Sequence, residues 1–132
     1  MQIDRVDHFV LTVRDVEATC AFYARVLGLE TVTHGAGRRA LQCGRQKINL
    51  QQVGQEADLR ATQPLPGAGD FCLITRLPIE QIAARVRAAG IALEGGPVVR
   101  GGALGPMQSV YFRDPDGNLV EVARYPDEAT AD

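Results

Sequence analysis

Hydrophobic and polar positions alternate near the start of the chain, over Val6–Val13, a stretch rich in β-branched and aromatic residues. This pattern is typical of a half-buried strand. Apolar residues then recur at helical spacing up to Leu27, with Asp15 placed as an N-cap and Gly28 as the C-terminal stop. The pattern therefore predicts a strand followed by a helix over residues 15–27.

Three short extended runs follow this helix, separated by turns that contain glycine. They are Leu29–Thr33, Arg39–Cys43 and Lys47–Gln52. Residues 53–69 contain Gly, Pro, Gln and charged residues without periodicity, which predicts a connecting segment. The first part of the chain is therefore predicted to run β-α-β-β-β.

The second part repeats this order. The predicted elements are a strand at Phe71–Thr75, a helix at Pro78–Ala89 and strands at Pro97–Arg100, Met107–Arg113 and Asn118–Arg124. The residues at 114–117, Asp-Pro-Asp-Gly, predict a tight hairpin between the last two strands. Aligning residues 7–12 with 70–75 reveals an internal repeat and sets Phe71 against His8.

These elements predict an α+β fold of two tandem βαβββ modules that form curved mixed half-barrel sheets. Module one spans about residues 4–52, the linker 53–69 and module two about 70–125. Together they make one domain over 1–125, because 132 residues suit a single core. Residues 126–132 are expected to form a flexible tail.

Composition narrows the possible partners. The net charge is −2, and no run of Lys or Arg is long enough to follow a phosphate backbone, which argues against nucleic acid. No apolar stretch approaches the roughly 18 residues that span a bilayer, so no membrane association is expected. Cys20, Cys43 and Cys72 form no CxxC pair and are interpreted as small buried residues of a cytoplasmic protein.

Few residue types remain that bind metals or move protons. His8 lies within the first strand, whereas His34 follows a strand beside a glycine and is interpreted as a solvated loop residue. Glu121 stands among aliphatic strand residues, where burial is costly unless the carboxylate is paired or coordinated. Gln51 offers a neutral amide oxygen. Each also has a structural interpretation, as an ordinary strand or hydrogen-bonding residue.

A histidine, a carboxylate and a neutral oxygen donor together suit a divalent ion such as Ni, Mn, Fe, Co or Zn. Competing motifs are missing from the sequence: the Gly-rich segments lack the P-loop context, and Ser109 lacks the glycines of a nucleophile elbow. Nucleophilic catalysis is therefore poorly supported.

Three segments taken together resemble the vicinal oxygen chelate superfamily, which comprises glyoxalases, bleomycin resistance proteins and extradiol dioxygenases. The segments are Val6–Asp15, Phe22–Gly28 and Tyr111–Glu121. The nearest subgroup by resemblance is that of glyoxalase domain-containing protein 5. The resemblance implies paired modules whose concave faces hold a metal ion and a small-molecule substrate, usually in a homodimer.

The resemblance also assigns positions. His8 matches the first-strand histidine ligand and Glu121 the last-strand glutamate ligand of the superfamily. Gln51 stands where the subgroup has a histidine, and Phe71 stands where many relatives have the histidine that opens the second module. These departures disfavour an extradiol dioxygenase and the fosfomycin-resistance arrangement, since both need the missing histidine.

We therefore expect a metal-dependent glyoxalase-like lyase or isomerase, or a related dioxygenase-like enzyme, acting on a small oxygen-chelating substrate. His8, Gln51 and Glu121 would bind the metal, and Glu121 would also act as the catalytic base. Tyr111, Arg113 and Asn118 are the candidate substrate-binding residues, with Arg100 as a further one. The alternative is a metal-free protein that binds or sequesters a small molecule, as bleomycin-resistance members do.

Overall fold

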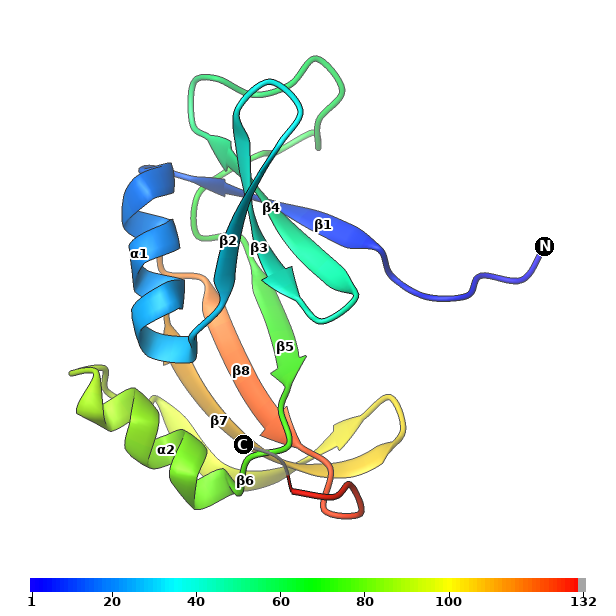
Figure 1. The fold of residues 1–132 in the computed structure, drawn as a ribbon, viewed down its shortest axis with the longest axis vertical. Helices are drawn as coiled ribbons and strands as arrows, with labels where there is room; N and C mark the ends of the chain where they lie inside the picture. Colours follow the sequence, from blue (N-terminus) through cyan, green and yellow to red (C-terminus); the bar gives the residue numbers. More distant parts are fainter. Residues whose placement is uncertain (131–132) are drawn as a thin grey trace. The chain divides into compact units, whose positions relative to one another are not determined.

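A computed structural model describes residues 1–130 of the chain. The chain divides into two compact units, Met1–Ala68 and Gly69–Asp132, and the division lies at the end of the predicted linker. Each unit has the order βαβββ (Figure 1). The predicted α+β fold of two tandem βαβββ modules is confirmed. Of the predicted tail, residues 131 and 132 lie outside the described residues.

The first unit forms a four-stranded mixed sheet with one helix. Its elements are β1 (His8–Val13), α1 (Val16–Leu27), β2 (Glu30–His34), β3 (Arg38–Cys43) and β4 (Gln46–Gln52). The strand order is β1-β4-β3-β2, in which β1 and β4 run parallel and the other neighbours antiparallel. The main differences from prediction are that β1 begins at His8 instead of Val6, and that β2 extends through His34.

Helix α1 begins and ends as the sequence predicted. The side chain of Asp15 accepts a hydrogen bond from the backbone N–H of Ala18 at 3.1 Å, which caps the first turn. Gly28 takes the left-handed conformation at φ 70°, and its N–H bonds back to carbonyls of the last turn. Tyr23 and Val26 on the buried side of the helix are fully buried.

The second unit repeats this architecture. Its elements are β5 (Asp70–Ile74), α2 (Ile79–Ala88), β6 (Gly95–Gly102), β7 (Gly105–Arg113) and β8 (Leu119–Arg124), in the sheet order β5-β8-β7-β6. Strand β6 is longer than predicted because Gly101 and Gly102 continue the antiparallel register with β7 up to the turn. Pro78 is the N-cap of α2 and not part of its first turn.

The turn at 114–117 joins β7 and β8 as an antiparallel hairpin, as predicted. Asp114 is 6% exposed, and its Oδ1 accepts hydrogen bonds from the backbone N–H groups of Asp116 and Asn118 at 2.9 and 3.0 Å. Gly117 has φ 88°, a conformation that favours glycine. Side-chain capping and one glycine therefore set this turn.

In each unit one face of the sheet packs against the helix, and alternate residues form the other face, here called the helix-distal face. Figure 1 shows α1 lying against the strands of its own sheet. The helix-distal face of the first sheet includes His8, Val10, Thr12, His34, Arg38, Ala40, Gln42, Lys47, Asn49 and Gln51. That of the second includes Asp70, Cys72, Tyr111, Arg113, Leu119 and Glu121. Within residues 1–130, neither helix is long and apolar enough to cross a membrane.

Candidate functional site

Strands β4 and β8 occupy equivalent places in the two modules, so their residues can be matched. The buried residues that anchor the match are Ile48 and Leu50 in β4 and Val120 and Val122 in β8. The residue between them is Asn49 in β4 and Glu121 in β8. Glu121 therefore corresponds to Asn49, and both side chains lie on the helix-distal face of their own sheet.

The same register corrects the predicted alignment of Phe71 with His8. His8 opens β1 and Asp70 opens β5, each on the helix-distal face of its sheet. Phe71 pairs with the fully buried Val120 and lies on the opposite face. A shift of one residue exchanges the two faces of a strand. The counterpart of His8 is therefore a carboxylate, Asp70.

Glu121 lies at the centre of a small polar cluster. It is the Cα partner of both Cys72 on β5 and Tyr111 on β7, and its carboxylate influences the pKa of their thiol and hydroxyl groups. Desolvation, and secondarily the Glu121 carboxylate, raise the pKa of Cys72 to about 12. The pKa of Tyr111 is raised by the same two causes, while Arg100, 6.0 Å from its ring centre, opposes the shift.

One oxygen of Glu121 is left without a partner. Its Oε2 is buried and has no hydrogen bond among the described residues. The same holds for Oδ1 of Asn49, the equivalent residue of the first module. Leaving a buried polar atom unpaired costs about 1–3 kcal/mol, so such atoms are rare in the absence of a ligand or water. Asn49 was missed in the sequence, although aligning β4 with β8 would have revealed it.

His8 has one ring nitrogen engaged. Its Nδ1 lies 2.7 Å from Oδ2 of Asp7, and the side chain is 45% exposed. This contact lowers the pKa of Asp7. A histidine that binds a metal ion through one ring nitrogen commonly donates a hydrogen bond to a carboxylate from the other. In His8 the nitrogen left for an ion is Nε2.

Gln51 is not brought together with His8. The two lie four residues apart along paired parallel strands, which is roughly 13 Å at about 3.3 Å per residue. The amide of Gln51 is also occupied: Nε2 donates to Oγ1 of Thr12 at 2.9 Å, and Oε1 accepts from the backbone N–H of Ala57 at 3.0 Å. Gln51 therefore supports the loop that follows β4, and both ends of its amide are engaged there.

The three predicted substrate-binding residues have different surroundings. Tyr111 lies beside Glu121, as described above. Arg113 is exposed and forms an ion pair with Glu94. Asn118 is 1% exposed, and its amide accepts from the backbone N–H of Gly69 at 2.7 Å and donates to Oδ2 of Asp114 at 2.8 Å. Asn118 is therefore a structural residue of the turn.

His34 and Cys72 also differ from expectation. His34 is the last residue of β2 and not a solvated loop residue, and its Nε2 is buried without a hydrogen bond among the described residues. Its pKa is lowered, first by burial and then by the positive charges of Lys47, Arg38 and His8. Cys20 is buried as predicted, whereas Cys72 is exposed.

The superfamily implies a divalent metal ion, and the residues fit one only in part. In residues 1–130, no three side chains of His, Cys, Asp or Glu are close enough together to hold an ion. Glu121 has a buried unpaired oxygen, and His8 has a carboxylate on its other nitrogen, so each has the chemistry of a ligand. Gln51 does not fit, because its amide is already bonded.

Comparison with known proteins identifies relatives of the chain. The chain is 49% identical over 125 residues to virulence protein STM3117 of Salmonella typhimurium, covering 95% of this chain and 87% of that protein. It is 42% identical over 127 residues to glyoxalase domain-containing protein RDO1 of Mycosarcoma maydis, covering 96% of this chain and 72% of that protein.

Solved structures with a similar fold include one of the same relatives. The crystal structure of STM3117 superimposes with a TM-score of 0.92, covering 95% of this chain and 99% of that chain. A lactoylglutathione lyase from Agrobacterium tumefaciens is 30% identical, with a TM-score of 0.72 and coverage of 94% and 96%. The model of the glyoxalase/bleomycin resistance protein/dioxygenase superfamily matches residues 5–122. The chain therefore belongs to the glyoxalase/bleomycin resistance protein/dioxygenase superfamily.

Proposed function

We propose that this protein is a divalent-metal-dependent lyase or isomerase of the glyoxalase type. The proposed ligands are His8 and, in place of Gln51, the side-chain oxygen of Asn49 in the first module, and Glu121 in the second. The observation that supports this most is the pair of buried, unpaired oxygens, Oε2 of Glu121 and Oδ1 of Asn49, at equivalent positions of the two modules. Oxygen and imidazole donors together suit Ni, Mn, Fe, Co or Zn.

The chemistry follows from the residues around Glu121. A bound ion supplies positive charge that stabilises negative charge on a substrate oxygen. Glu121 accepts a proton from the substrate, and Tyr111, its Cα partner on β7, orients it. Cys72 contacts the same carboxylate from the neighbouring strand. Glu121 is thus the proposed catalytic residue, and Tyr111 is a positioning residue.

The proposal also covers the subgroup, the cellular compartment and the oligomeric state of the protein. We assign the chain to the glyoxalase domain-containing protein 5-like subgroup and expect it to act as a cytoplasmic homodimer on a small molecule. The relatives support this assignment in part, since RDO1 is named a glyoxalase domain-containing protein. The similarity to a lactoylglutathione lyase supports the reaction class.

Metal content tests the proposal. The full chain is loaded with each of the five ions, desalted and assayed by elemental analysis. The wild type and Gln51→Ala are expected to retain the ion, whereas His8→Ala and Glu121→Gln lose it. The loaded wild type should also convert the adduct of a 2-oxoaldehyde and a thiol to a thioester, and Glu121→Gln should not. Stoichiometric metal in His8→Ala, or loss in Gln51→Ala alone, would contradict the assignment.

The second candidate is a metal-free protein that binds or sequesters a small molecule. The engaged amide of Gln51 favours it, because this predicted ligand is committed to the fold. It predicts that small-molecule binding measured by calorimetry is the same with and without EDTA. Loss of binding on chelation would rule it out and favour the metalloenzyme.

A further inference from the structure

We infer that the helix-distal face of the first sheet binds an oxyanion, the phosphate or carboxylate group of a small molecule, through Lys47 and Arg38. The inference rests on the proposed function, because it takes the bound molecule to be the substrate of the proposed enzyme. It therefore identifies that substrate as an anion.

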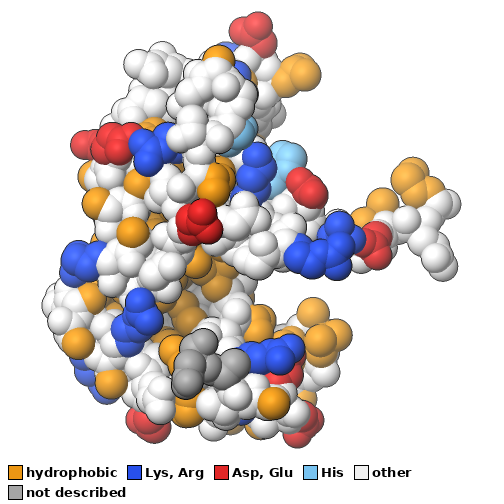
Figure 2. All heavy atoms as spheres, viewed as in Figure 1, with side chains coloured by type: hydrophobic (Ala, Val, Ile, Leu, Met, Phe, Trp, Pro, Cys, Tyr) orange, Lys and Arg blue, Asp and Glu red, His pale blue; other side chains and the backbone are white. Residues whose placement is uncertain are grey.

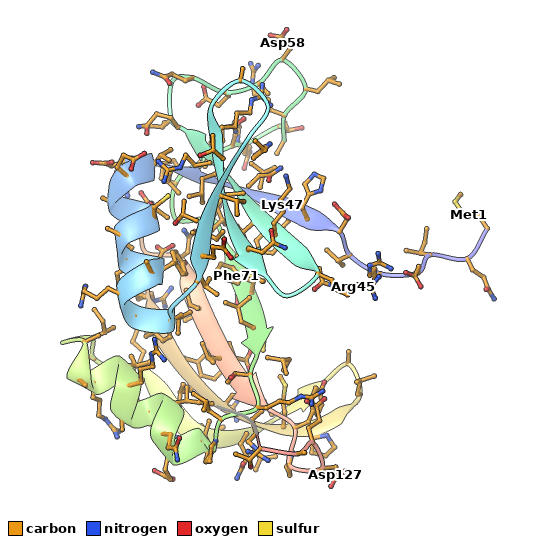
Figure 3. The ribbon with its side chains drawn as sticks, in the orientation of Figure 1. Met1, Arg45, Lys47, Asp58, Phe71 and Asp127 are labelled. Atoms are coloured by element: carbon orange, nitrogen blue, oxygen red, sulfur yellow. The ribbon has the colours of Figure 1, made fainter. Side chains whose placement is uncertain are left out.

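The register places the two cations on this face. Lys47 on β4 pairs with His8 on one side and Gln42 on the other. Arg38 opens β3 and pairs with His34 of β2. Figure 3 labels Lys47 on β4 and Arg45 at the tip of the β3–β4 hairpin. Lys47, Arg38, His8 and His34 therefore share one sheet face. Lys47 and Arg38 are four residues apart along neighbouring strands, roughly 13 Å at about 3.3 Å per residue, so their long side chains must lean toward each other to reach one anion.

Neither cation has a counter-ion. Among the described residues, the side chains of Lys47 and Arg38 take part in no ion pair. The nearby carboxylate of Asp7, which feels the charge of Lys47, is hydrogen-bonded to His8. Glu30 lies on the same face beyond Gln42 and forms no ion pair with Lys47. Figure 2 shows a histidine side chain near β1 with a Lys or Arg side chain on one side and an Asp or Glu side chain on the other.

Two buried polar atoms adjoin these cations. His34 Nε2 and Asn49 Oδ1 both lack a hydrogen-bond partner among the described residues. Unpaired positive charge beside unpaired polar atoms is the arrangement expected of a site that recognises an anion bearing further polar groups.

The low pKa of His34 is consistent with this site. Burial lowers the pKa of His34 most, and the charges of Lys47, Arg38 and His8 lower it further. An arginine can bind an oxyanion through two parallel N–H bonds, and a lysine acts as a point charge. An anion bound between them would reverse part of the shift and raise the pKa of His34.

The test is an NMR titration of the full chain with inorganic phosphate, and separately with acetate, at constant ionic strength and with EDTA present. We expect saturable shifts of the His34 ring signals and of the Lys47 and Asn49 amides, and a rise in the pKa of His34. Lys47→Gln and Arg38→Gln should each weaken binding about tenfold, the effect of losing one charge-assisted hydrogen bond. Whichever of phosphate and acetate saturates at the lower concentration identifies the group.

The matched control is Arg25→Gln, which removes the same charge from α1, on the other side of the sheet. It should leave the titration unchanged. Linear shifts of equal size in all variants, or saturable binding that survives both Lys47→Gln and Arg38→Gln, would overturn the inference. Because EDTA removes any metal, anion binding is measured independently of metal content. A chain that binds metal but no anion would refute this inference alone.

Discussion

Replacing asparagine by alanine at position 118 and, separately, at position 49 tests the different roles that the structure gives these two residues. Asn118→Ala removes two hydrogen bonds of a 1% exposed amide, at 2.7 Å to the N–H of Gly69 and at 2.8 Å to the Asp114 carboxylate. A neutral hydrogen bond contributes about 1 kcal/mol and one to a charged group about 1.5–3 kcal/mol. The substitution should therefore lower the free energy of unfolding by about 3 kcal/mol. It should also loosen the start of β5.

Asn49→Ala is expected to behave differently. Its Oδ1 is buried without a partner among the described residues, so little stabilisation is lost and one desolvation cost disappears. We expect the free energy of unfolding to change by no more than about 0.5 kcal/mol, or to increase, as is common when a residue that serves function is replaced. Urea unfolding followed by circular dichroism measures both values. A loss above about 2 kcal/mol in Asn49→Ala, with less than about 1 kcal/mol in Asn118→Ala, would refute the two assignments.

Two further predictions concern titratable groups. Cys72, with a pKa of about 12, should react slowly with iodoacetamide near neutral pH. Glu121→Gln should speed this reaction by lowering the pKa, as followed by peptide mass spectrometry, and an unchanged rate would argue against their contact. The pKa of His34 is lowered below 6.5 by burial and by the charges of Lys47 and Arg38, so the unfolded chain binds more protons and stability falls as the pH drops from about 7 to 5. His34→Gln should flatten this dependence in urea titrations, and an equally steep curve would contradict it.

Much of the fold could be predicted from local patterns. Asp15 and Gly28 mark the ends of α1 because capping and positive φ are local requirements. The turn at 114–117 was recognised for the same reason, since its hydrogen bonds join neighbours in the chain. The repeated order of strands and helices revealed the two modules, although the length of β6 depended on pairing with β7.

The candidate site was predicted less completely. His8 and Glu121 were recognised by residue type and family resemblance, and both retain the chemistry of ligands. Gln51 and Asn118 were chosen by the same reasoning, yet their amides are bonded within the fold. A sequence shows that a polar side chain is present, but not whether its hydrogen bonds are already made.

By itself, the sequence determined the family, the two βαβββ modules, the ends of α1 and the hairpin at 114–117. The tertiary structure decided the strand register, which matched Asp70 to His8 and Asn49 to Glu121. It also placed Lys47, Arg38 and His34 on one face. The physical reason is that strand pairing joins residues far apart in the chain, and a shift of one residue exchanges the two faces of a strand.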